Sequence, residues 1–160
     1  MKSLNGLVND LYAAHKEYVN SYYTTLHILF TACYMRQLRP AIDRMTTLKQ
    51  DAEGRFAKNV TNSMIHKNGP QFFRLYRETP YESYRIIMAH YTDVMRNYVI
   101  RVLRTSYMSV PMDLALEWLD IDEDEQVIVS FNGVFQPSCI EKVDQRIIHF
   151  QRRNKKRSTV

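Results

Sequence analysis

Apolar side chains recur at helical spacing along most of the first 108 residues of the chain. A short run from Leu4 to His15 precedes the segment Glu17–Leu38, where apolar residues occupy nearly every side of a helix. Pro40 favours a helix start in the next segment, and Asp51 is a typical N-cap for the helix after it. The pattern therefore predicts a series of short helices, with the second one buried nearly all round. Its apolar spacing is formed by Val19, Tyr22, Tyr23, Leu26, Phe30 and Cys33.

The stretch HKNGPQFFRLYRETP, residues 66–80, places aromatic side chains between two helix-breaking signals. Asn68-Gly69-Pro70 is typical of a helix end. Phe72, Phe73 and Tyr76 then share one face of a helix predicted over residues 70–79. Burying one Phe side chain contributes about 1.5–3 kcal/mol. We therefore expect these aromatic residues to be structural, wedged between the helical array and the helix that follows.

The strongest periodicity begins after Pro80 and keeps one apolar face for about 20 residues. It predicts a single long helix, with arginines and an aspartate on the opposite face. The apolar face is predicted to hold Tyr84, Ile87, Met88, Tyr91, Met95, Tyr98, Val99, Val102 and Leu103.

The pattern changes near Ser109, where Ser109 or Asp113 is expected to cap a short helix. The acidic run Asp120–Glu125 suits a solvated helix start, because acids stabilise the N-terminal end of a helix. The VIVSFNGVF segment after it fits a helix or a strand. Two short β segments are predicted around Val143–Gln145. We expect a small α+β end in which β structure occurs only after about Phe131.

Composition is that of a globular protein, with 45% hydrophobic and 24% charged residues. The formal net charge of +5 is compatible with nucleic acid, an acidic protein or a membrane surface, and does not choose among them. No apolar run approaches the roughly 20 residues that span a bilayer, so no membrane segment is expected. Cys33 and Cys139 are solitary, which suggests reduced core thiols of an intracellular protein.

Catalytic and metal-binding motifs were not found in the sequence. The five histidines are scattered without zinc spacing, and there is no glycine-rich phosphate loop or nucleophile elbow. The acidic run lacks the glycine and terminal glutamate of a calcium loop. We therefore expect no enzyme activity, no cofactor and no metal.

Three segments in this order resemble the GANP (Sac-three) family, a group with the PCI fold. They are YYTTLHILF, then FAKNVTNSMIHKNGPQFFRLYRETP, then MRNYVIRVLRTSYMSVPMDLALEWLDI. The string Phe72 to Tyr76 is similar to a family signature, and Pro111 lies in the segment that resembles the family's entry to a winged helix. The resemblance covers roughly residues 17–150.

The resemblance implies a mostly α protein: a helical-repeat part over residues 1–108, a winged-helix subdomain over 109–150 and a basic disordered tail over 151–160. It implies a non-enzymatic scaffold that pairs with a second PCI protein and a small acidic subunit of the DSS/Sem type. Such a scaffold would bind RNA or DNA in mRNA export, as in the TREX-2 assembly, or in transcription-coupled mRNA processing. It would be nuclear, for example at the nuclear pore, with a cytoplasmic location as the alternative. Trp118 and Ile121 are the expected partner interface.

Nucleic-acid binding is expected from arginines and lysines near the C-terminal end. The tail QRRNKKRSTV packs five positive charges into six positions, and mobile charges of this kind can follow a phosphate backbone. The same string resembles a nuclear import signal. The expected nucleic-acid contacts are Arg101, Arg104, Arg146, Arg152, Arg153, Lys155, Lys156 and Arg157.

Two alternatives stay open. The first is a PCI subunit of the proteasome lid, the signalosome or translation initiation factor three. The second is a stand-alone winged-helix protein that binds nucleic acid, which requires a basic recognition helix. The segment Pro111–Leu119 carries Asp113 and Glu117 and no Arg or Lys, which argues against the second alternative.

Overall fold

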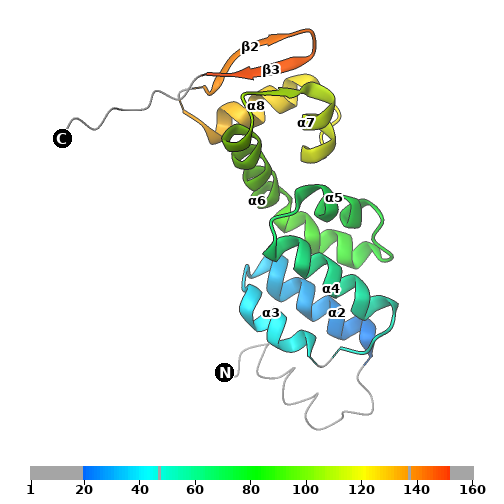
Figure 1. Cartoon of the computed structure of the whole chain (residues 1–160). Coiled ribbons are helices and arrows are strands. Elements are labelled where there is room, and N and C mark those ends of the chain that lie inside the picture. The colour runs from blue at the N-terminus through cyan, green and yellow to red at the C-terminus, as the bar shows by residue number, and fades with distance from the viewer. Residues whose placement is uncertain (1–19, 47, 137, 152–160) are drawn as a thin grey trace, which may run out of the picture. The chain divides into compact units, whose positions relative to one another are not determined.

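The computed structural model describes residues 20–46, 48–136 and 138–151, so the helix predicted at residues 4–15 and the tail from residue 152 lie outside the described residues. The described chain is mostly helical with a small antiparallel sheet near its C-terminal end (Figure 1), which confirms the predicted fold class. It forms two compact units. Unit 1 comprises the described residues up to Asn62 and Thr79–Tyr91, and unit 2 comprises Ser63–Glu78 and the described residues from Thr92 onward.

The predicted domain boundary after residue 108 falls inside unit 2, and that division stays a prediction. Helices α4 and α6 each contribute residues to both units. The elements are α2 (Ser21–Leu29), a π-helical turn η2 (Phe30–Tyr34), α3 (Leu38–Met45), α4 (Ala52–Ile65), α5 (Gly69–Arg77), α6 (Glu82–Ser106), β1 (Ser109–Pro111), α7 (Met112–Leu119), α8 (Asp124–Val134), β2 (Ile140–Asp144) and β3 (Ile147–Phe150).

Helix α2 in unit 1 is not buried on all sides, so that prediction is wrong. Tyr23 is 59% exposed, and Tyr34 in the adjoining π-helical turn is 53% exposed. Part of the buried face consists of Thr24 and Thr25 instead. Their hydroxyls donate to backbone carbonyl oxygens at 3.2 and 3.1 Å, which offsets the cost of burying them. Apolar spacing could not reveal this face because threonine counts as polar.

Tyrosine contacts connect α2 to the start of α6 within unit 1. Tyr84 is fully buried, and its hydroxyl donates to the carbonyl oxygen of Tyr22 at 3.0 Å. The two rings stack with centroids 5.4 Å apart. The Tyr22 hydroxyl lies 2.8 Å from the Ser83 hydroxyl. Burial raises the pKa of Tyr84, so this hydroxyl stays protonated and keeps donating.

The predicted N-cap of α4 is confirmed. The Asp51 carboxylate accepts a hydrogen bond from the Gly54 N–H at 2.9 Å, and it also accepts one from the Ser21 hydroxyl. The carbonyl oxygen of Asp51 accepts from the Arg55 N–H at 3.0 Å. One side chain therefore starts α4 and connects it to α2.

The Asn68-Gly69 pair begins α5, which corrects the prediction that this pair would end a helix. Lys67 has the left-handed conformation that ends α4, with a φ of 53°. The N–H groups of Lys67 and Asn68 donate to carbonyls in the last turn of α4 at 3.3 and 2.8 Å. The Asn68 side chain then accepts from the Gln71 N–H at 3.2 Å and caps α5.

Gly69 allows α5 to pack closely against two other elements of unit 2. A Cβ at this position would overlap Val99 Cγ2 in α6 and would lie 3.5 Å from the Trp118 carbonyl oxygen in α7. Phe72 and Phe73, on the same helix, have no exposed surface, and Tyr76 is half-buried. The short aromatic helix is therefore held in place by close packing at the Gly69 backbone as well as by its buried side chains.

Helix α6 confirms the predicted long helix after Pro80. Its apolar face is buried at most predicted positions, but Val102 is 41% exposed, so its assignment to that face is wrong. Ile100 is 1% exposed and is buried instead. Ile100 is buried because it contributes to the core of the C-terminal part of unit 2.

Unit 2 ends in a winged-helix arrangement: the end of α6, then β1, α7, α8, β2 and β3. The sheet has the order β1-β3-β2, with both pairs antiparallel. Strand β1 contradicts the expectation that β structure occurs only after about Phe131. The sequence did not predict it because its three residues, of which Pro111 is one, are too few to show a strand pattern. The buried core of this part contains Val99, Ile100, Leu103, Val110, Met112, Ala115, Leu119, Val127, Phe131, Cys139, Ile148 and Phe150.

Neither Ser109 nor Asp113 caps α7, so that prediction is wrong. Ser109 belongs to β1, and Asp113 lies inside the first turn of the helix. Pro111 occupies the capping position, and the Met112 N–H donates to the Arg146 carbonyl oxygen at 2.7 Å. The tertiary fold supplies the acceptor that a local side chain would otherwise provide.

Helix α8 resolves the choice between helix and strand for the segment after the acidic run. Asp124 and Glu125 lie in its first turn, where negative charge is favourable. The two predicted β segments are confirmed as β2 and β3, joined by Gln145 and Arg146. Both turn residues have positive φ, 48° and 59°, as a tight two-residue hairpin turn requires.

Candidate functional site

Helix α8 is the second helix of the helix pair, the position that a recognition helix takes in this motif. Its sequence, DEQVIVSFNGV, contains two acids and no Arg or Lys. Helix α7 also lacks Arg and Lys. Neither helix offers the positive charge that contact with phosphates requires.

Arg146, an expected nucleic-acid contact, lies at the hairpin turn between two carboxylates. Its guanidinium donates to Asp113 at 2.7 Å and to Asp124 at 2.8 Å. These residues lie in the first turns of α7 and α8. The hydrogen bond with Asp113 is the main reason that the pKa of Arg146 is raised. Arg146 thus fastens the hairpin to both helices, and its charge is balanced locally.

Arg101 and Arg104, also expected to contact nucleic acid, lie in the last turns of α6. The Arg104 guanidinium lies 5.5 Å from the centre of the Phe150 ring and donates to the Gln151 carbonyl oxygen at 2.6 Å. The Arg101 guanidinium lies 6.0 Å from the Phe135 ring centre. Arg104 and Arg146 therefore lie at opposite ends of β3. The other five expected contacts lie in the tail, outside the described residues.

Trp118 and Ile121, the expected partner interface, are half-buried and pack against the core of the winged-helix part. Ile121 also lines a surface pocket of about 260 Å³, together with Leu116 and Arg77. The structure therefore leaves Ile121 accessible to a partner. Trp118 is partly accessible, and its role at an interface stays a prediction.

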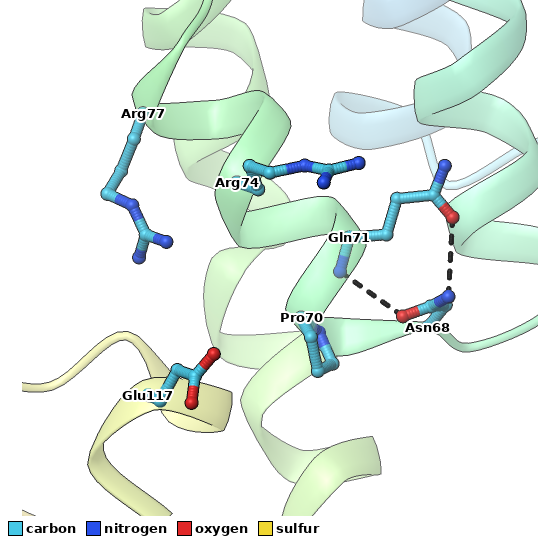
Figure 2. A pocket seen from close by; sticks show the side chains of 6 residues that line it. All are labelled: Asn68, Pro70, Gln71, Arg74, Arg77 and Glu117. Carbon is cyan, nitrogen blue, oxygen red and sulfur yellow. Dashed lines mark hydrogen bonds between the residues drawn. The ribbon is translucent and has the colours of Figure 1, made fainter. Parts of the chain in front are cut away.

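A larger surface pocket, of about 460 Å³, lies between α5 and α7 (Figure 2). Arg74 and Arg77 of α5 and Glu117 of α7 are among the residues that line it, and Figure 2 shows the Arg74 side chain directed toward Gln71, away from Arg77 and Glu117. The sequence pattern did not single out these residues. An available signal was the spacing of the two arginines, three apart and therefore on one side of a short helix whose other side is aromatic.

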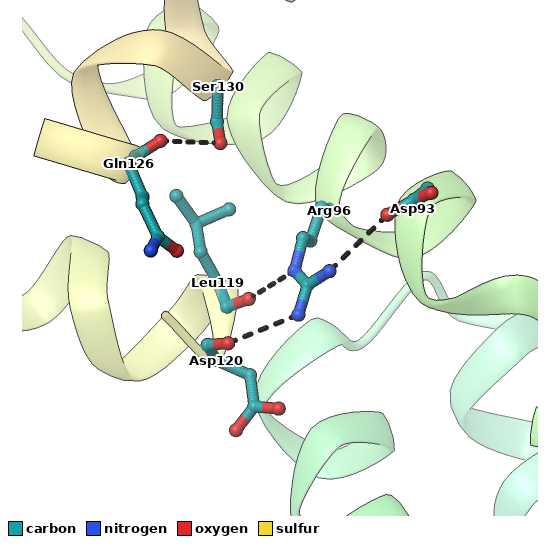
Figure 3. A network of polar contacts seen from close by, with 6 residues as sticks. All are labelled: Asp93, Arg96, Leu119, Asp120, Gln126 and Ser130. Atoms are coloured by element: carbon teal, nitrogen blue, oxygen red, sulfur yellow. Dashed lines mark hydrogen bonds and ion pairs between the residues drawn. The ribbon is translucent and has the colours of Figure 1, made fainter. Parts of the chain in front are cut away.

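The end of α7 beside this pocket is held by arginines from two helices. The Arg96 guanidinium of α6 donates to the carbonyl oxygens of Leu119 and Asp120 at 2.9 and 3.2 Å (Figure 3). Arg77 of α5 forms an ion pair with the Asp120 carboxylate. Asp120 itself has a left-handed backbone, with a φ of 54°. Carbonyl groups at a helix C-terminus favour such cations, so the wall of the pocket is rigidly positioned.

The described residues contain no group of three or more His, Cys, Asp or Glu side chains that could hold a metal ion. Burial raises the pKa of the Cys33 thiol to about 12, which leaves it protonated at neutral pH. Burial likewise raises the pKa of Cys139. Neither thiol has the lowered pKa that reactive cysteines show. Among the described helices, none is both long and apolar enough to cross a bilayer.

A family model matches residues 21–136, which is most of the chain, and its description is the CSN8/PSMD8/EIF3K family. The chain belongs to this family. The family is of the PCI type, so the predicted PCI fold is supported, whereas membership of the GANP family is not shown. No curated protein and no solved structure was found to match the chain. The family favours the first alternative over the GANP prediction.

Proposed function

We propose that the chain is a non-enzymatic scaffold subunit of a multi-subunit assembly of the proteasome-lid, signalosome or translation-initiation-factor-three type. The observation that carries this proposal is the family match over residues 21–136. Proteins of this PCI-type family assemble with other PCI proteins. The acidic helix α8 supports the proposal, because it favours a protein partner over a nucleic acid at the winged-helix part.

We propose strand β2 as the surface that pairs with a second PCI protein. The sheet order leaves β1 and β2 as its two edges. Strand β1 has three residues and contains Pro111, whereas β2 has five residues and no proline. Backbone groups at an open strand edge can pair with a strand of another chain. The longer strand without proline is the better edge for this purpose.

Val143 carries the backbone groups that would pair. The two-residue turn closes on the pair Asp144 and Ile147, so these two residues exchange hydrogen bonds. The next pair, Val143 and Ile148, is then of the non-bonded kind. The N–H and C=O of Val143 therefore face away from β3. Its side chain is also 42% exposed.

The experiment is native purification of the tagged full chain from its own cells, followed by mass spectrometry. We expect PCI subunits of one assembly to copurify in a stable ratio. Val143→Pro removes the outward N–H donor and should release them. The matched control Val143→Thr keeps the N–H and a β-branched side chain, and it should retain them. Circular dichroism checks that both variants are folded. Copurification without any PCI protein would contradict the proposal.

The finer predictions drawn from the GANP resemblance are kept as proposals of lower priority. They are a role in mRNA export with TREX-2, a small acidic DSS/Sem-type subunit, RNA or DNA binding, and a nuclear location. The acidic subunit has a test in the same purification, because a small acidic protein would appear in the same stable ratio. Nucleic-acid binding and nuclear location depend on the basic tail.

A further inference from the structure

Helix α2 and the turn η2 in unit 1 carry a stripe of aromatic side chains beside their buried face. Tyr23, His27, Phe30 and Tyr34 follow the spacing i, i+4, i+7 and i+11, so they share one side of the helix. Tyr23 is 59% exposed and Tyr34 is 53% exposed, whereas the two rings between them are half-buried. The described residues therefore leave this aromatic stripe partly uncovered.

The aromatic stripe is continuous and carries no charge. The rings of Phe30 and Tyr34 stack with centroids 4.9 Å apart, and Tyr34 meets the His90 ring of α6 edge-on at 4.9 Å. Burial and the charge of Arg44 lower the pKa of His27, so its ring is uncharged at neutral pH. Apolar side chains that gather in one exposed patch mark a contact site, whereas scattered ones do not.

The N-terminal segment supplies an apolar face of matching length. Residues 4–15 lie outside the described residues, and their sequence predicts a helix with one apolar side, formed by Leu4, Leu7, Val8 and Leu11. A helix of this length is about 18 Å long, and α2 with η2 measures about 20 Å. The two elements are therefore long enough to cover each other.

The connection between the two elements is short. Four residues separate His15 from Asn20, which caps α2 by accepting a hydrogen bond from the Tyr22 N–H at 2.9 Å. Two helices joined by so few residues usually lie antiparallel. A tether of this length gives an effective concentration of about millimolar, which favours the tethered segment over a separate partner.

We propose that residues 4–15 form a helix that lies antiparallel to α2, with its leucine side on the aromatic stripe. Leu11 then lies nearest Tyr23, and Leu4 lies nearest Tyr34. The outermost helix of a repeat array needs a polar outer side, which Asn9 supplies. The proposal goes beyond the proposed function, because it holds whether or not the chain joins an assembly.

Disulfide cross-linking of the purified full chain tests this position. Leu11→Cys with Tyr23→Cys should form an intramolecular disulfide under mild oxidation, seen as a faster band on a non-reducing gel. Asn9→Cys with Tyr23→Cys is the matched control. Asn9 lies on the opposite side of the predicted helix, so this pair should cross-link at least about tenfold more slowly, since a disulfide needs close Cβ atoms. The native Cys33 and Cys139 are buried and should not compete.

The other occupants of the aromatic stripe give different results in this experiment. Disulfide-linked dimers would show that a second copy of the chain covers the stripe. No disulfide at all would leave the stripe open to a separate partner protein. Equal rates for the two cysteine pairs would show that the segment has no fixed position. Each of these three results would overturn the proposal.

A double-mutant cycle measured by urea unfolding tests the contact without new cysteines. Leu11→Ala and Tyr23→Ala should each lower the urea midpoint, and together they should lower it by less than the sum, because both remove the same contact. Val129→Ala is the control, since this side chain is 69% exposed on α8 in unit 2 and its effect should simply add to that of Leu11→Ala. Additive effects of the first two changes would also overturn the proposal.

Discussion

Gly69 and Gly133 both lie in helices, but only Gly133 has space for a side chain. A Cβ at Gly69 would overlap Val99, a buried β-branched residue that cannot move away easily. A Cβ at Gly133 in α8 would meet nothing within 4 Å. Only the first glycine is required by packing.

The two glycines therefore form a matched test. Gly69→Ala should lower the free energy of unfolding by about 1–3 kcal/mol, the usual cost of adding volume to a packed core. Gly133→Ala should raise it by about 0.4–1 kcal/mol, because alanine loses less conformational entropy on folding. Urea denaturation of the two variants beside the parent protein measures both changes. Equal effects of the two substitutions would show that Gly69 is not in close contact with α6.

Several residues behave as their type predicts, and others depend on tertiary contacts. Asp51 caps α4 and Phe72 is fully buried, because capping and large apolar surface are local properties of the residue. Lys67 adopts a left-handed backbone that favours glycine, although Gly69 is two residues away. Thr25 is buried because its hydroxyl reaches the Glu53 carbonyl of another helix. Neither the left-handed backbone of Lys67 nor the burial of Thr25 is indicated by the sequence.

At the scale of elements, Asp51 connects the start of α4 to α2, and this connection depends on pH. The pKa of its carboxyl lies below the usual value, chiefly because the Ser21 hydroxyl donates to it and next because the Gly54 N–H does. A lowered pKa in the folded state adds stability above the unfolded pKa of about 3.9. This stability is lost as the pH falls through the folded value.

Asp51→Ala should therefore lower the free energy of unfolding by about 0.5–2 kcal/mol at pH 7, the usual cost of losing an N-cap. The difference from the parent protein should shrink as the pH falls from 7 to below the unfolded pKa of about 3.9, because the carboxylate then takes up its proton. Thermal unfolding of both proteins across this range is the measurement. Asp43→Ala, at an exposed position of α3, is the control. A difference that does not change with pH would show that the carboxylate charge contributes nothing.

The long helix α6 could be predicted from the sequence, and the three-residue strand β1 could not. Helix α6 repeats its apolar pattern over 25 residues, so single errors such as Val102 do not hide it. Strand β1 has three residues and becomes a strand only because β3 pairs with it. The surface pocket between α5 and α7 forms only where these two helices meet, and the absence of a side chain at Gly69 permits that contact. Candidate sites made of distant elements are therefore the part that sequence spacing misses.

At the scale of the whole molecule, the chain belongs to a PCI-type family whose members assemble with other PCI proteins. Helices α7 and α8 contain no Arg or Lys, and Arg146 is paired with two carboxylates, so these residues contribute little free positive charge to the net charge of +5. Five of the basic residues lie within Arg152–Arg157. Nucleic-acid binding, if the chain has it, should therefore come from the tail.

Changing Arg152, Arg153, Lys155, Lys156 and Arg157 together to Ser tests this prediction. Affinity for RNA or DNA should fall, and the log–log dependence on salt should become shallower by about 0.7–0.9 for each lost phosphate contact. Sequence preference should hardly change, because phosphate contacts carry no base information. Filter binding across a salt series is the measurement. Arg146→Gln should change the slope much less, since Asp113 and Asp124 already balance that charge. If the slope and the nuclear signal of a fluorescent fusion both survive the fivefold change, the tail serves only to keep the protein in solution.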